Sequence, residues 1–267
     1  MIYSSSFNDK DINSIRQSKQ IFSDCYMLSS LEALSHSTQG RNILSSNIQK
    51  FQVGTPVGAT TFKDEFCKNA CSCENALHSG DSFRIRFNNI NGNQEDFFIS
   101  QENSKYKEIN KKQKNPIICA FETAMSELFE KHPDRKFWIS KLIFPFKKSF
   151  EYNKVSNFME MFTGKKPYVL AETSMNLNLK PYEQEVYKLL EKMGSLGSDN
   201  YSFVAGSGMI KMDDGHRWHC YTVMHVDNDK KKIVLMDKRT NEPSEYSFDE
   251  AIKKLKYFVG YFNEDLK

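Results

Sequence analysis

Long apolar runs and a strong charge of one sign are both absent from this chain of 267 residues. Nowhere do 18 consecutive apolar residues occur, so we expect no membrane span. The formal net charge is only +3, from 37 lysines and arginines against 34 acidic residues, and so small an excess does not indicate nucleic-acid binding. The first residues also lack a basic segment followed by an apolar run, so we expect no Sec signal peptide.

Cysteines are few, and their spacing is irregular. Six cysteines in a chain of this length, without a signal peptide, fit free thiols in a reducing compartment better than a secreted disulfide scaffold. A chain of this length can bury a core without covalent cross-links. We therefore expect a cytoplasmic protein, or one that reaches the cytosol of a host cell without a Sec signal.

The spacing of apolar residues predicts helices over residues 24–37, 117–131 and 182–193. Asp24 stands where its side chain can cap the first of them. Between the first two, residues 105–114 are rich in lysine and are predicted to form a polar loop.

Alternating residues predict strands in two places. Residues 82–87 and 95–99 are expected to pair as a hairpin that turns at Asn91-Gly92. After His219, two strands are expected to turn at Asp227-Asn228-Asp229. The C-terminal third is therefore predicted to be mainly β.

No internal repeat is visible in the sequence. The shift from helical patterns to strand patterns along the chain predicts an α+β fold in two subdomains. The first, residues 1–155, would be helical and carry the β-hairpin. The second, residues 156–267, would be rich in strands. A cleft between them is the expected active site.

Cys25 and His219 have the character of a thiol nucleophile and its base. Cys25 opens the first predicted helix, where the positive end of the helix dipole stabilises a thiolate. His219 begins a predicted strand, and an imidazole brought beside the thiol would stabilise the thiolate further. His216, three residues earlier, is the competing base.

Four segments stand in an order that is typical of one enzyme family. They cover residues 20–28, then 82–99 with 115–131, then 159–164, and finally 189–197 with 219–223. In this order they resemble the nucleophile segment, hairpin and helix, subdomain junction, and histidine strand of a calpain catalytic core, in the papain-like cysteine protease superfamily. The resemblance implies a papain-like fold with two subdomains and peptide-bond hydrolysis through a thioester on Cys25.

The resemblance also implies a third residue that orients the imidazole. The family has an Asn on the strand after the His, and Asp237 aligns with it. An Asp can accept the imidazole N–H and favour the imidazolium. Asn241, four residues later, is the alternative.

For the oxyanion, the family pairs the backbone N–H of the Cys with the side chain of a Gln upstream. Gln20 is the candidate, and it lies five residues before Cys25 where the family usually has six. Gln17 is the alternative donor.

Calcium control is not expected. A Pro-Trp follows the orienting Asn in calpains, and its Trp takes part in a calcium-gated closure; Lys238-Arg239 replaces it here. No D-x-[DN]-x-[DN]-G loop is present either. We predict a calcium-independent site without a cofactor.

Three cysteines and a histidine form a C-x3-C-x-C-x4-H pattern, namely Cys67, Cys71, Cys73 and His78. Four such ligands could hold zinc, but the spacing matches none of the common C-x2-C knuckles. We therefore expect cysteines of a polar loop, with a zinc site as the alternative.

The function predicted from these residues is that of a cysteine endopeptidase acting on a protein substrate. A deamidase or acyltransferase is the alternative enzyme, because a thioester does not dictate its acceptor, and a catalytically dead binding module is the non-enzymatic one. The abundance of Lys, Asn, Phe and Ile and the polar start resemble effectors that bacteria inject into host cells. That resemblance implies a host protein as substrate.

Overall fold

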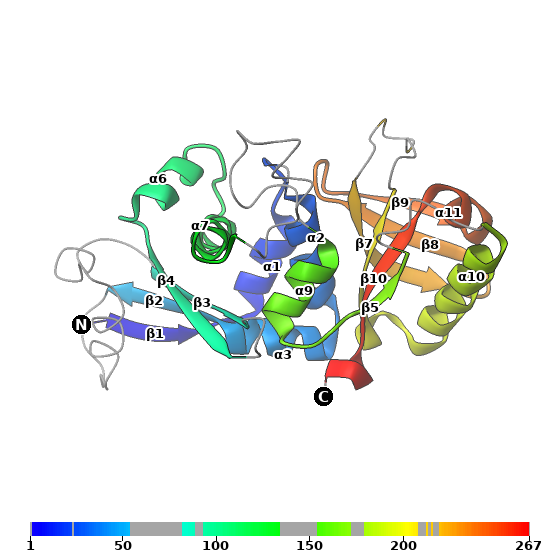
Figure 1. Ribbon diagram of the computed structural model, residues 1–267, viewed down its shortest axis with the longest axis horizontal. Coiled ribbons are helices and arrows are strands. Elements are labelled where there is room, and N and C mark those ends of the chain that lie inside the picture. Colours follow the sequence, from blue (N-terminus) through cyan, green and yellow to red (C-terminus); the bar gives the residue numbers. More distant parts are fainter. Residues whose placement is uncertain are drawn as a thin grey trace.

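The computed structural model combines helices with two antiparallel sheets, which confirms the α+β class (Figure 1). It describes residues 2–22, 24–53, 82–88, 93–133, 154–171, 179–207, 212, 215 and 219–266. The α-helices in these ranges are α1 (Asp9–Gln17), α2 (Cys25–His36), α3 (Thr38–Asn47), α6 (Ser104–Asn110), α7 (Pro116–Lys131), α9 (Val155–Thr163), α10 (Leu179–Leu196) and α11 (Phe248–Lys254). Over the same ranges, no helix has both the length and the apolar character that a membrane crossing requires.

The first sheet has four strands in the order β1-β2-β3-β4. They are β1 (Ile2–Ser6), β2 (Ile48–Val53), β3 (Ser82–Asn88) and β4 (Gln94–Ser100). The predicted hairpin is confirmed as β3 and β4, although its predicted turn at Asn91-Gly92 lies outside the described residues. β2 was not predicted, because its buried residues Ile48 and Phe51 are three apart and do not show the alternation of a strand.

The second sheet has six strands in the order β5-β10-β6-β7-β8-β9. They are β5 (Tyr168–Leu170), β6 (Tyr201–Gly206), β7 (Cys220–Asp227), β8 (Lys232–Asp237), β9 (Glu242–Ser247) and β10 (Tyr257–Phe262). The predicted strand pair is confirmed as β7 and β8, which turn where expected. This sheet carries most of the C-terminal third.

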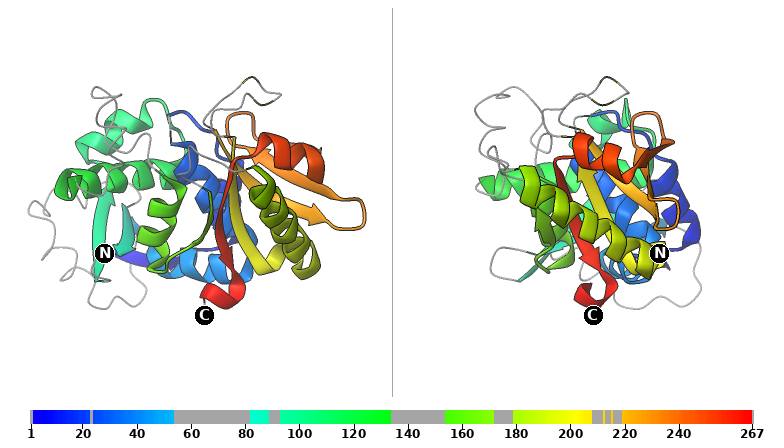
Figure 2. Two further views of the ribbon diagram at one scale, coloured as in Figure 1. Left: turned by 45° about the vertical axis from the view of Figure 1, so that its right-hand side comes forward. Right: turned by 90° about the vertical axis from the view of Figure 1, so that its right-hand side faces the viewer.

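Residues of the six-stranded sheet alternate between two hydrophobic cores, as the period of two in a strand requires. One set of side chains points toward the first core, which also holds α2, α7 and α9; these residues are Val204, Cys220, Val259 and Tyr261. The alternate set points toward the second core, which holds α10 and α11; these residues are Phe203, Ala205, Tyr221 and Phe258. Figures 1 and 2 show α10 and α11 on the side of this sheet away from α2. The sheet is therefore covered on both faces.

Helix α2 lies between the four-stranded sheet and the six-stranded sheet (Figure 1). The residues predicted to face inward are fully buried, and they are Met27, Leu28, Leu31 and Leu34. The sequence pattern predicted one buried face, yet every residue from 26 to 35 is buried. The reason is this central position, which covers the polar side of the helix with β7.

The polar loop predicted over residues 105–114 is wrong for its first part, because α6 occupies residues 104–110. The side chain of Asn103 caps this helix by accepting from the N–H groups of Lys105 and Tyr106. Tyr106 and Ile109, three residues apart, are buried against the core. Two buried apolar residues and an N-cap thus stabilise a helix in this lysine-rich segment, and the lysines are tolerated because their ammonium groups reach solvent.

The chain passes from one sheet to the other after α9. Apolar residues of α9 such as Phe158 and Phe162 pack in the first core, and β5 then opens the second sheet. The subdomain boundary near residue 155 stays a prediction.

We expect Leu31→Ala to lower the free energy of unfolding by about 2–5 kcal/mol, because it removes a fully buried side chain of α2 and leaves a cavity. Leu196→Ala is the matched control, since Leu196 is 41% exposed at the end of α10. Its effect should stay within about 0.5 kcal/mol. Urea unfolding followed by circular dichroism measures both, and equal losses would contradict the central role of α2.

Candidate active site

Cys25 is the first residue of α2. Asp24 occupies the N-cap position, but its side chain makes no capping hydrogen bond, so the predicted side-chain cap is wrong. The backbone carbonyl of Asp24 accepts instead from the N–H groups of Met27 and Leu28. The first N–H groups of a helix have no acceptor within it, and they carry the positive end of the helix dipole. The thiol therefore stands where an anion is favoured.

His219 stands directly before β7 and is fully buried. Its backbone N–H donates to Ser207 Oγ at 3.2 Å, and its carbonyl accepts from the Ser207 N–H at 3.1 Å. The ring meets the edge of Tyr221 at a centroid distance of 4.8 Å and an angle of 90°. Neighbouring residues thus hold both the backbone and the ring of His219.

Asp237 ends β8 and accepts from the imidazole of His219, with 2.7 Å between Nε2 and Oδ1. The register explains the contact: Asp237 pairs with Tyr221, two residues beyond His219, so the carboxylate lies diagonally across from the imidazole. The N–H of Arg239 donates to the same Oδ1 at 2.8 Å and fixes the carboxylate. The side chain of Asn241, the alternative, accepts instead from Lys238 Nζ at 2.9 Å.

The thiol of Cys25 and the imidazole of His219 lie close enough to interact electrostatically, so the structure brings Cys25, His219 and Asp237 together. Burial alone would lower the pKa of His219, but the hydrogen bond to Asp237 and the charges of Cys25 and Asp237 raise it to about 9. For Asp237, burial opposes ionisation, yet the hydrogen bond and charge of His219 lower the pKa below its ordinary value. The group can therefore hold an imidazolium at neutral pH.

Cys220 is a second thiol in the site, and sequence reasoning missed it. A hydrogen bond from the Cys220 side chain is the largest cause that holds the pKa of Cys25 well below its ordinary value; burial opposes this, and His219 reinforces it. Cys220 Sγ also lies 3.0 Å from Tyr257 Oη. The signal in the sequence was the alternation of β7, which turns Cys220 toward the core that contains α2.

Gln20 lies between α1 and α2. Its Nε2 donates to the carbonyl of Phe22 at 2.6 Å, and its backbone N–H donates to the carbonyl of Lys238 at 2.7 Å. An amide nitrogen carries two hydrogens, so this side chain can donate one more hydrogen bond. Gln17, the alternative, is exposed and lines a polar cavity beside α1.

Several predicted candidates fall outside the described residues, namely His216, Cys67, Cys71, Cys73 and His78. Within the described part of the chain, no group of three or more His, Cys, Asp or Glu side chains is placed to hold a metal ion. The zinc alternative stays a prediction for the cysteine cluster.

Comparison with known proteins does not assign the chain to a family. No protein-family model matches the chain, and no curated protein matches it. The chemical interpretation of the site therefore depends on the geometry and on the sequence motifs.

We expect Cys220→Ala to slow alkylation of Cys25 by iodoacetamide at pH 6 by about threefold to tenfold, because a hydrogen bond to the thiolate is lost. Peptide mapping by mass spectrometry measures the rate at Cys25. Cys119→Ala is the control, since Cys119 Sγ donates to the Gln113 carbonyl at 2.9 Å and burial raises its pKa to about 12. Unchanged alkylation in the Cys220→Ala protein would remove Cys220 from the site.

Proposed function

We propose that the protein is a cysteine endopeptidase of the calpain-like, papain-like kind, with Cys25 as nucleophile. One observation carries the proposal: Cys25 at a helix start contacts His219, whose imidazole is held by Asp237 at 2.7 Å. A thiol with a lowered pKa beside an imidazole with a raised pKa forms a thiolate and imidazolium pair, which is the reactive state of such enzymes.

The arrangement of elements supports a papain-like fold. The proposed nucleophile begins a buried helix, whereas the proposed base stands directly before one strand, and its partner ends the paired strand, of an antiparallel sheet that packs against that helix. In this proposal the two subdomains meet near α2, and the substrate cleft opens at its N-terminal end.

The reaction follows thiol acyl transfer. The Cys25 thiolate attacks the carbonyl carbon of the scissile bond, and the oxyanion takes hydrogen bonds from the Cys25 N–H and the second hydrogen of Gln20 Nε2. The His219 imidazolium gives its proton to the departing amine as the C–N bond breaks. Neutral His219 then removes a proton from water, whose oxygen attacks the thioester and releases Cys25. Asp237 holds the imidazole throughout.

The substrate proposed is a protein, such as a host protein if the chain is an injected effector. The reducing cytosol proposed as its location would keep the Cys25 thiol free. The proposed chemistry uses no calcium, because its steps need only Cys25, His219, Asp237 and Gln20.

We expect the wild-type protein to cleave denatured protein substrates and Cys25→Ala to lose at least about 10³-fold of that activity. Cys119→Ala, which removes a buried thiol outside the site, should retain it. Mass spectrometry of the products distinguishes new termini, which support a peptidase, from a one-dalton gain on glutamine or a transferred acyl group, which would contradict it. Cleavage should persist with a calcium chelator.

We expect kcat/KM of the wild type to fall above about pH 9, because His219, whose pKa is raised to about 9, must be protonated to release the amine. Below the pKa of His219 the imidazolium is present; above it the proton is lost. Asp237→Asn keeps an acceptor for the imidazole but removes the charge, so the fall should come at lower pH. Asp237→Ala also loses the orientation and should cost about 10²-fold at neutral pH.

Glu242→Gln is the matched control for the pH profile, because it removes an exposed carboxylate on the residue that pairs with Asp237 across β8 and β9. Its profile should match that of the wild type. If Asp237→Asn and Glu242→Gln both left the alkaline fall in place, Asp237 would not be the partner of His219.

A further inference from the structure

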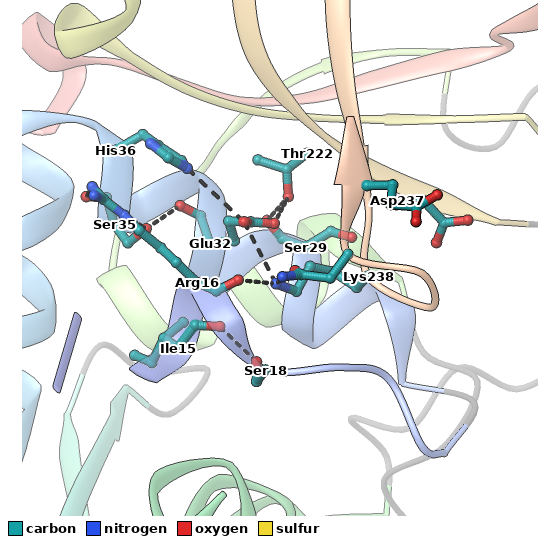
Figure 3. Close-up of polar contacts among 12 residues, drawn as sticks. Ile15, Arg16, Ser18, Ser29, Glu32, Ser35, His36, Thr222, Asp237 and Lys238 are labelled. Carbon is teal, nitrogen blue, oxygen red and sulfur yellow. Dashed lines mark hydrogen bonds and ion pairs between the residues drawn. The ribbon is translucent and has the colours of Figure 1, made fainter. Parts of the chain in front are cut away.

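A buried ion pair beside the proposed triad joins segments that are far apart in the sequence (Figure 3). Lys238 Nζ lies 3.5 Å from Glu32 Oε1, and the two side chains are 0% and 1% exposed. Lys238 directly follows Asp237, whereas Glu32 lies in the middle of α2. The pair therefore connects the turn after β8 to the helix that begins with Cys25.

Both charges have further partners. Lys238 Nζ donates to the carbonyl of Arg16 at 2.7 Å and to Asn241 Oδ1 at 2.9 Å. Glu32 Oε2 accepts from Thr222 Oγ1 at 3.0 Å. The single ammonium thus contacts the end of α1, the middle of α2 and the turn before β9.

The backbone of the same turn reaches two members of the proposed site. The Lys238 carbonyl accepts from the N–H of Gln20 at 2.7 Å. The N–H of Arg239 donates to Asp237 Oδ1 at 2.8 Å, and the Asp237 carbonyl accepts from the N–H of Asn241 at 2.7 Å. A shift of this turn would therefore displace the carboxylate and the glutamine together.

Stability alone does not account for such a pair. Taking two charges out of water costs free energy that their attraction repays only with good geometry, and apolar replacements of buried pairs are often as stable. The ammonium, however, has three N–H donors, and here three acceptors on three segments surround it, on Glu32, Arg16 and Asn241. No apolar side chain could fix three segments in direction as well as in distance.

We propose that Lys238 is a positioning residue for the Cys25, His219 and Asp237 triad, an inference that rests on the proposed function. Its ammonium holds the turn of residues 237–241 against α1 and α2. Asp237 thereby stays within hydrogen-bond distance of His219, and the segment that carries Gln20 stays in place. Lys238 is fully buried and acts through these neighbours rather than on the substrate.

The test is the double variant Glu32→Gln/Lys238→Met. Lys238→Met alone would leave Glu32 buried without its cation, whereas the double variant removes both charges, and the new glutamine can still accept from Thr222. We expect a folded protein whose kcat falls about 10- to 100-fold with little change in KM, because the triad is displaced while the substrate-binding surface stays intact. The alkaline fall of kcat/KM should also move to lower pH.

Lys232→Met is the matched control. Lys232 lies on the same strand, β8, and pairs with Glu245 at 2.5 Å, but both side chains are more than 40% exposed. Kinetics and pH profile should equal those of the wild type. A loss shared by Lys232→Met and the double variant would be a general effect of losing a lysine on this hairpin and would overturn the proposal.

A second readout does not need hydrolysis. The pH profile of Cys25 alkylation by iodoacetamide reports the thiolate and its imidazolium, and in the double variant it should move toward that of an ordinary thiol. If the wild type hydrolyses nothing, the proposed function fails, and this profile still tests Lys238. If hydrolysis is normal in the wild type and the double variant keeps both its kcat and its alkylation profile, the Lys238 proposal alone is overturned.

If the double variant does not fold, the variant Asn241→Gly tests the positioning role of Lys238. It removes one acceptor of the ammonium and leaves the ion pair intact, and the φ of 61° at Asn241 suits glycine. We expect kcat to fall threefold to tenfold, which corresponds to the loss of about one hydrogen bond. Wild-type kcat and alkylation in the Asn241→Gly protein would then overturn the proposal.

Discussion

The burial of α2 on every side is the constraint on which the rest of the structure depends. A helix that is buried all round must find partners for each polar group on it, since an unpaired polar group in a core costs free energy. Here β7 supplies several of them: Ser29 Oγ donates to the Cys220 carbonyl at 3.0 Å, and the Thr222 hydroxyl shares its hydrogen between the Ser29 carbonyl and Glu32 Oε2, each at 3.0 Å. These bonds fix the helix against the strand along its axis and in rotation, which packing of apolar side chains alone would not do.

Once α2 is fixed against β7, the contact between Cys25 and His219 follows from geometry. Ser29 lies one helical turn beyond Cys25, and it bonds to Cys220, the residue after His219. The start of the helix is thereby brought to the start of the strand, where the positive end of the dipole, the Cys220 thiol and the imidazole all favour a thiolate. The low pKa of Cys25 is thus a consequence of how the helix is anchored.

Local patterns in the sequence were enough to predict α2, α7, the β3–β4 hairpin and the turn between β7 and β8, because each has a strong period or a turn dipeptide. The pairing of Asp237 with His219 was anticipated only through the resemblance to the calpain core, which aligns Asp237 with an orienting Asn. Cys220 and Lys238 could not be anticipated, since their roles depend on which segment packs against the strand. For the same reason the local sequence predicts a loop where α6 forms: Tyr106 and Ile109 stabilise the helix only by packing against a core built from distant segments.

The location of Lys238 shows why a charged residue is useful at this point. The nucleophile and its base lie on different elements, so their alignment depends on the joints between those elements rather than on either element alone. Two segments that meet only through apolar contacts can shift relative to each other, because dispersion is non-directional. An ammonium with three acceptors instead has one arrangement of lowest energy. The turn after β8 meets α1 and α2 at such a joint, and the buried pair with Glu32 restricts the sliding that would separate Asp237 from His219.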